Sequence, residues 1–111
     1  MITIESLKSY GANVEEGLAR CLNKEDFYIK MVNLGLKDER FDKLSDILAS
    51  KDLDSAFEAC HALKGVIGNL ALTPLYEPIS KMTELLRART AMDYTELVAE
   101  VKSQRDKLLA M

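Results

Sequence analysis

The 111-residue chain has the length of one domain with a single hydrophobic core. Hydrophobic residues make up 48% and charged residues 30% of the sequence, which excludes a disordered chain and fits a globular protein. The net charge of −3 argues against nucleic acid or an anionic membrane as the main partner, since both select a basic surface.

No apolar run approaches the roughly 20 residues that a membrane-spanning helix requires. The first residues, Met1 to Glu5, lack the basic start and apolar centre of a secretory signal. We therefore expect the protein to lie in the cytoplasm. Cys21 and Cys60 are far apart and form no CxxC pair, so we predict two reduced thiols on apolar helix faces rather than a zinc site.

The apolar spacing predicts an almost entirely helical chain, because no segment alternates apolar and polar residues over the length of a strand. A short helical lead-in is expected within about residues 3–12, from Ile4 to Tyr10, and Gly11 should end it. Asn13 is then expected to cap a second short helix that runs from Val14 to about Leu22.

The main bundle is expected over about residues 24–110, and Asn23 is predicted to cap its first helix. The helical spacing of apolar residues resumes over residues 39–49, after Gly35. The sequence does not decide whether this region forms one long helix with an irregular middle or two separate helices. The main apolar stripe of the first part is expected to consist of Phe27, Met31 and Leu34, and Tyr28 and Val32 are expected to widen it on one side.

A central helix is expected from near Asp52 to Leu70. Thr73 is predicted to cap the next helix, with Pro74 at its first position, and Asp93 to cap the last one. Short connections favour antiparallel neighbours. The sequence thus predicts an all-α fold, an up-and-down antiparallel four-helix bundle with short extra helical segments at the N-terminus. The helices suffice to close it within one chain, so we expect a monomer.

The central helix carries the only histidine of the chain, His61. On a helical wheel at about 100° per residue, Gly65 and Gly68 fall within about 40° of His61, and the apolar arc is centred roughly 140° away. Lys64 lies about 60° from His61 on one flank and Glu58 about 60° on the other. His61 is therefore predicted to stand off the core, on a face without side chains over the next two turns.

This pattern suits phosphoryl transfer. An exposed imidazole is largely neutral at pH 7, and its ring nitrogen can then attack an acyl phosphate. Gly65 and Gly68 would let a partner's active site approach the ring, and Lys64 would offset the charge of the phosphoryl group. The surface expected to dock a partner comprises Phe57, which would also shelter the ring, Glu58, Ala62, Gly65, Gly68 and Asn69.

Each feature also has an ordinary explanation. A lone histidine on a helix surface is usually only solvated, and a surface lysine is no different. Glycines in helices more often permit close helix packing than partner access, although Gly65 and Gly68 lie away from the apolar arc. The conjunction of these residues on one face is more informative than any one of them.

At these residues the sequence resembles the histidine-containing phosphotransfer (HPt) domain of bacterial phosphorelays. The run His61-Ala62-Leu63-Lys64-Gly65, with Gly68 a turn later, is similar to the family's signature. A weaker similarity begins at the stretch from Asn13 to Arg20 and extends to about Arg89. With this resemblance, we expect residues 1–111 to form a single HPt domain.

The resemblance implies that His61 accepts a phosphoryl group from an aspartyl phosphate on a receiver domain and passes it to another receiver. It also implies that Lys64 serves as the phosphate-side cation. Partners would be the receiver domains of response regulators and hybrid histidine kinases. Any Mg²⁺ would belong to the receiver, so no cofactor, metal site or autonomous kinase activity is expected in this chain. Ala71 stands where the family frequently has a glycine, and we expect it to narrow the choice of receivers from the flank of the His61 face.

Two other functions compete with this interpretation. The chain could be a helical interaction module that binds a receiver or kinase without accepting phosphate. It could also be a carboxylate-bridged metal bundle, because Glu58-x-x-His61 matches the spacing of such sites. That architecture requires the motif twice, and the chain has one histidine.

Overall fold

The computed structural model describes all 111 residues and contains seven helices and no strand, which confirms the all-α prediction. No helix is long and apolar enough to cross a membrane. The helices are α1 (Ile4–Tyr10), α2 (Val14–Arg20), α3 (Glu25–Leu36), α4 (Arg40–Ala49), α5 (Leu53–Asn69), α6 (Thr73–Arg87) and α7 (Thr95–Leu109).

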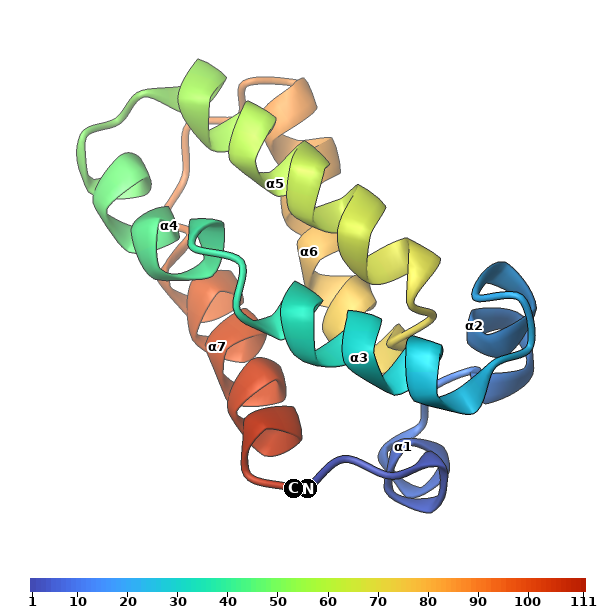
Figure 1. The fold of residues 1–111 in the computed structure, drawn as a ribbon. Helices are drawn as coiled ribbons and strands as arrows, with labels where there is room; N and C mark the ends of the chain where they lie inside the picture. The colour runs from blue at the N-terminus through green and yellow to red at the C-terminus, as the bar shows by residue number, and fades with distance from the viewer.

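Four elements close the bundle around one core. Helix α5 packs on α4 and α6, and α7 contacts both α6 and α4 on the opposite side (Figure 1). Helix α3 extends the α4 edge of the bundle and also contacts α7. The fourth position of the predicted four-helix bundle is therefore shared by two consecutive helices, α3 and α4.

The break between α3 and α4 answers the question that the spacing left open. Residues 37–39 separate the two helices, and the Asp38 carboxylate accepts a hydrogen bond from the Arg40 amide at 3.0 Å. From α7, Arg105 Nε donates to the carbonyl oxygen of Leu36 at 2.7 Å, and its Nη1 lies 2.9 Å from Asp42 Oδ1. One guanidinium therefore joins the end of α3 to the start of α4, which holds the break in place.

The apolar arc of α5 faces the core as the wheel predicts. Ala56, Cys60, Leu63 and Ile67 are buried, and Leu70, just past the helix, is 6% exposed. Both cysteines are buried free thiols, as predicted. Burial raises the pKa of Cys60 to about 12.

The prediction of Phe27 and Leu34 in the main buried stripe of α3 is wrong, whereas Tyr28 and Val32, expected only to widen it, are fully buried. The buried residues are Tyr28, Val32, Gly35 and Leu36, and the first three of these each lie one position after an expected residue. Phe27 is 42% and Leu34 is 54% exposed. The Tyr28 hydroxyl donates to the carbonyl oxygen of Leu70 at 2.8 Å, so its polar end is satisfied inside the core.

Three predicted helix caps are also displaced by a residue or more. Asn23 lies in a turn with φ of 56°, and α3 begins after Lys24 without a side-chain cap. Thr73 is the first residue of α6 rather than its cap, and Leu72 takes the cap position. Asp93 precedes the cap position of α7, yet its carboxylate still accepts from the Thr95 amide at 2.9 Å. Asn13 does cap α2, by accepting from the Glu16 amide.

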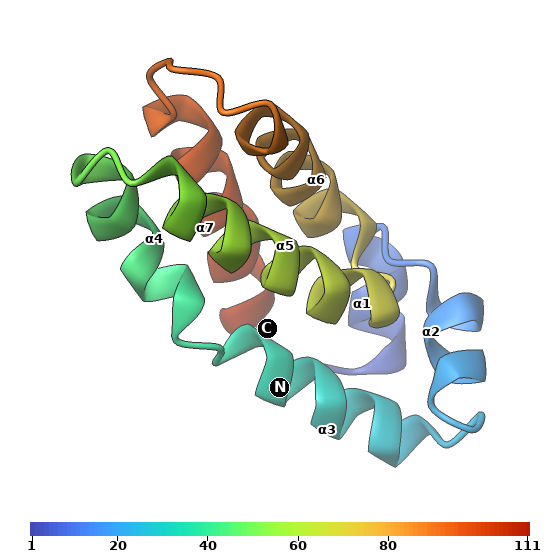
Figure 2. The same cartoon turned by 90° about the horizontal axis from the view of Figure 1, so that it is seen from above.

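The N-terminal segment of α1 and α2 joins the bundle, with α2 beside the C-terminal end of α5 (Figure 2). Arg20 Nη1 donates to the carbonyl oxygen of Gly68 at 2.7 Å, and the Asn13 amide donates to that of Ala71 at 2.9 Å. Leu7, Val14 and Cys21 of this segment belong to the same hydrophobic cluster as the bundle. The segment therefore fixes the end of the helix that carries His61.

Candidate functional site

His61 is exposed on α5, away from the buried arc of that helix. The Phe57 ring, one turn earlier, stacks on the imidazole with a centroid separation of 5.5 Å and an interplanar angle of 21°. Two guanidinium carbons lie over the Phe57 ring, that of Arg87 at 5.1 Å and that of Arg89 at 4.9 Å from its centroid. The imidazole is thus held by a half-buried aromatic ring while its other faces meet solvent.

The two glycines of the His61 face differ in their surroundings. A Cβ atom added at Gly65 would meet no atom within 4 Å, so this turn of the helix is open. A Cβ atom at Gly68 would lie 3.1 Å from Cε2 of Tyr76 on α6. Close packing of α5 on α6 therefore accounts for Gly68, whereas nothing in the fold requires a glycine at residue 65.

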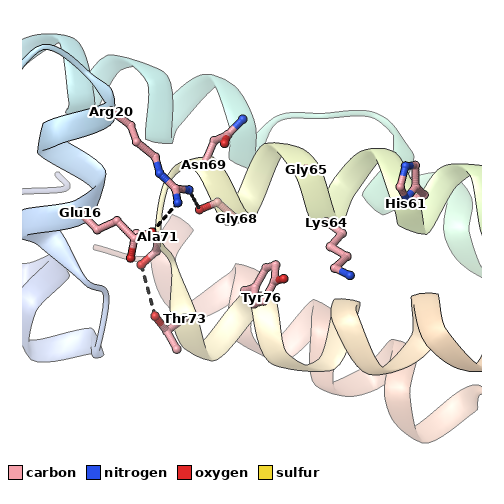
Figure 3. Close-up of a pocket in the computed structure, with 10 residues that line it drawn as sticks. All are labelled: Glu16, Arg20, His61, Lys64, Gly65, Gly68, Asn69, Ala71, Thr73 and Tyr76. Atoms are coloured by element: carbon pink, nitrogen blue, oxygen red, sulfur yellow. Dashed lines mark hydrogen bonds and ion pairs between the residues drawn. The ribbon is translucent and has the colours of Figure 1, made fainter.

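The Lys64 side chain is directed toward α6, away from His61 (Figure 3). Its Nζ lies 3.4 Å from Oε1 of Glu84, and Lys64 is 24% exposed. The other Glu84 oxygen lies 3.1 Å from Nε of Arg87. The expected phosphate-side cation is consequently engaged by a carboxylate that the sequence reading did not single out.

An open groove of about 530 Å³ runs from His61 along the glycine face toward α2 (Figure 3). Its far end is formed by Arg20 and Glu16, which pair with each other on α2. The sequence analysis did not single out Arg20 and Glu16 as site residues, although both lie within the stretch that carries the weaker family resemblance. The groove is lined by Glu16, Arg20, His61, Lys64, Gly65, Gly68, Asn69, Ala71, Thr73 and Tyr76.

Comparison with known protein families matches residues 37–111, about two thirds of the chain, to the Hpt domain. The chain belongs to the Hpt domain family. Members of this family serve phosphotransfer in two-component systems as phosphocarriers and interact with receiver domains of response regulators. Neither a search of curated proteins nor a search of solved structures returned a match.

The family match of this Hpt chain begins within the turn between α3 and α4. The histidine-bearing helix α5 falls inside it, together with α4, α6 and α7. Helices α1 to α3 fall outside it, so their inclusion in one HPt domain over residues 1–111 stays a prediction.

The predicted position of Ala71 on the flank of a helix is wrong, whereas its influence on the choice of receivers stays a prediction. Helix α5 of this Hpt domain ends at Asn69, so a helical wheel does not apply to Ala71. Ala71 has φ of 57° and is 7% exposed, and thus lies in a left-handed turn rather than on the flank of a helix. A glycine adopts that backbone conformation without the steric cost that a Cβ atom adds, about 1–2 kcal/mol. This gives a conformational reason for a glycine at this position.

The other expected docking residues divide between the groove and its surroundings. Asn69 is exposed and lines the groove, whereas exposed Glu58 and half-buried Ala62 lie outside it. No group of three or more histidine, cysteine or acidic side chains gathers where a metal ion could bind, and Glu58 and His61 have no such third neighbour. Whether the docking residues touch a receiver stays a prediction.

Proposed function

We propose that the chain is a phosphorelay phosphocarrier in which His61 accepts a phosphoryl group from a receiver-domain aspartyl phosphate and passes it to another response-regulator receiver. The observation that carries the proposal is the exposed imidazole of His61 beside the open turn at Gly65, in a chain of the Hpt family.

The step balances without further reagents. The unprotonated ring nitrogen of His61 attacks phosphorus and forms the N–P bond. The P–O bond to the aspartyl oxygen breaks, and its electron pair stays on that oxygen as a carboxylate. The other ring nitrogen keeps its proton. Transfer to a second receiver is the reverse reaction on a different aspartate, and it requires mainly positioning and charge stabilisation.

The surroundings of His61 suit such a step. The Phe57 ring fixes the orientation of the imidazole, and the open turn at Gly65 leaves room for a partner's surface. Lys64 lies one turn away, on a stem long enough to reach a phosphoryl group after leaving Glu84.

The remaining parts of the proposal concern the partner. Mg²⁺ is assigned to the receiver domain, and this chain supplies no kinase activity of its own. Receivers of response regulators and of hybrid kinases are the proposed donors and acceptors, with neither nucleic acid nor a membrane as a partner. A monomer in the cytoplasm stays the predicted form of the protein.

The test is a transfer assay with isolated receiver domains from the same genome, each charged with radiolabelled acetyl phosphate and freed from excess donor. Label should move to the wild-type chain within minutes and should not move to His61→Gln. The Gln variant should keep the helical circular dichroism spectrum of the wild type, because residue 61 is outside the core.

The competing interaction module gives a different result. Stable binding of a receiver with no label on the wild-type chain would favour it. Label on His61→Gln would place the phosphoryl group elsewhere and contradict the assignment.

A further inference from the structure

Lys64 forms a cluster of charges with Glu84 and Arg87, two residues that have no role in the transfer step described above. Glu84 on α6 uses both carboxylate oxygens, one toward Lys64 Nζ at 3.4 Å and one toward Arg87 Nε at 3.1 Å. The Arg87 guanidinium and the Lys64 ammonium hold the pKa of Glu84 below its usual value, so the carboxylate is ionised at neutral pH. Lys64 is the less exposed partner, at 24% against 55% for Glu84.

The two arginines over the Phe57 ring also have ionic partners, and that of Arg87 is Glu84 itself. Arg89 Nε lies 2.5 Å from Asp54 Oδ1, and its Nη1 donates to the carbonyl oxygen of Leu86 at 2.7 Å. Lys64 is the basic residue nearest to His61 in the sequence, and its single ionic partner is Glu84. Its position three residues after His61 places it next to the imidazole on the helix surface.

A phosphoryl group on His61 would compete with Glu84 for this lysine. Phosphorylation of a side chain adds about two negative charges at pH 7 and three strong acceptor oxygens. The four-carbon stem of lysine lets the ammonium turn from one anion to the other without a change in the backbone. Glu84 keeps Arg87 as a partner after Lys64 leaves, so its carboxylate still has an ionic partner when the lysine is released.

We propose that Glu84 is a positioning residue that holds Lys64 away from unphosphorylated His61 and, by competing for it, lowers the affinity of His61 for the phosphoryl group. This inference rests on the proposed function of His61. The consequence suits a carrier, because a phosphohistidine that is bound too strongly would not return its phosphoryl group to a receiver. Glu84 therefore sets the balance between phosphohistidine and aspartyl phosphate.

The test measures that balance at equilibrium, approached from both directions, between the full chain and one receiver domain with Mg²⁺ present. Glu84→Gln should shift the ratio of phosphohistidine to aspartyl phosphate toward His61 by about three- to fivefold, the scale of one partly exposed ion pair. Glu77→Gln is the matched control, since Glu77 is an exposed glutamate on the same helix outside the cluster. It should leave the ratio unchanged within about twofold.

A double-mutant cycle separates competition for Lys64 from simple repulsion between Glu84 and the phosphoryl group. In a Lys64→Gln background, Glu84→Gln should shift the ratio by less than about twofold. An equal shift in both backgrounds, or no shift with Lys64 present, would overturn the inference while leaving the proposed function intact. Absence of any phosphorylation of His61 in the wild-type chain would instead overturn both.

Discussion

Gly65 offers a test that separates the stability of the fold from its function, through two different substitutions at one residue. It lies in the interior of α5 with an ordinary helical backbone, and a Cβ atom there would meet nothing within 4 Å. Gly65→Ala removes the conformational cost of glycine in a helix and should stabilise the fold by about 1 kcal/mol. For a domain of this size, that change corresponds to a rise of about 4 °C in the melting temperature.

Urea unfolding followed by circular dichroism measures the stability change, and the receiver assay measures transfer. Gly68→Ala is the control, because Tyr76 must move to admit the new methyl group, so its gain should be smaller than that of Gly65→Ala. Gly65→Glu should also fold, but it should slow transfer by about tenfold or more through steric and charge conflict with the approaching receiver.

Two results would refute this reasoning. A loss of stability in Gly65→Ala would show that the fold itself requires the glycine. Normal transfer by Gly65→Glu would show that no partner surface approaches this turn, and the access role of Gly65 would then be wrong.

Three further changes test the fold around the site. Gly17→Ala should destabilise by about 1–3 kcal/mol, because its Cβ atom would lie 2.6 Å from the Tyr28 ring; a stability equal to wild type in urea unfolding would contradict this. Tyr28→Phe should cost about 1 kcal/mol in the same assay, because the Leu70 carbonyl loses its buried donor; an unchanged midpoint would argue against that hydrogen bond. Hydrogen bonds from the Ser55 side chain and amide lower the pKa of Asp52 at the start of α5. Asp52→Ala should therefore be less stable than wild type above the ordinary aspartate pKa of 3.8, and the difference should disappear as the pH falls through the lower folded pKa; a gap that persists in acid would contradict this.

The periodicity of α5 predicted which face is buried and which face carries His61, because its apolar residues occupy one arc. In α3 the same reasoning failed. Both the stripe of Phe27 and Leu34 and the stripe of Tyr28 and Val32 are apolar at helical spacing, so a wheel cannot choose between them. The tertiary structure makes the choice, because the Tyr28 hydroxyl donates to the carbonyl oxygen of Leu70, just past the end of α5.

Contacts between segments far apart in the sequence could not be predicted from helical periodicity. Helical spacing places Lys64 beside His61, but it gives no sign of Glu84, 20 residues later, as the partner of that lysine. The approach of Tyr76 to Gly68 likewise depends on how α5 and α6 cross. The position of Ala71 was missed because the helix ends two residues earlier, and the wheel assumed that it continued.

The central claim is that the phosphoryl group resides on His61. Because the chain has one histidine, [¹⁵N]histidine labelling gives nitrogen signals from a single imidazole. After incubation with a phosphorylated receiver and Mg²⁺, one ring nitrogen of the labelled chain should show coupling to ³¹P. An imidazole spectrum that stays unchanged while the receiver loses its phosphoryl group would contradict the account.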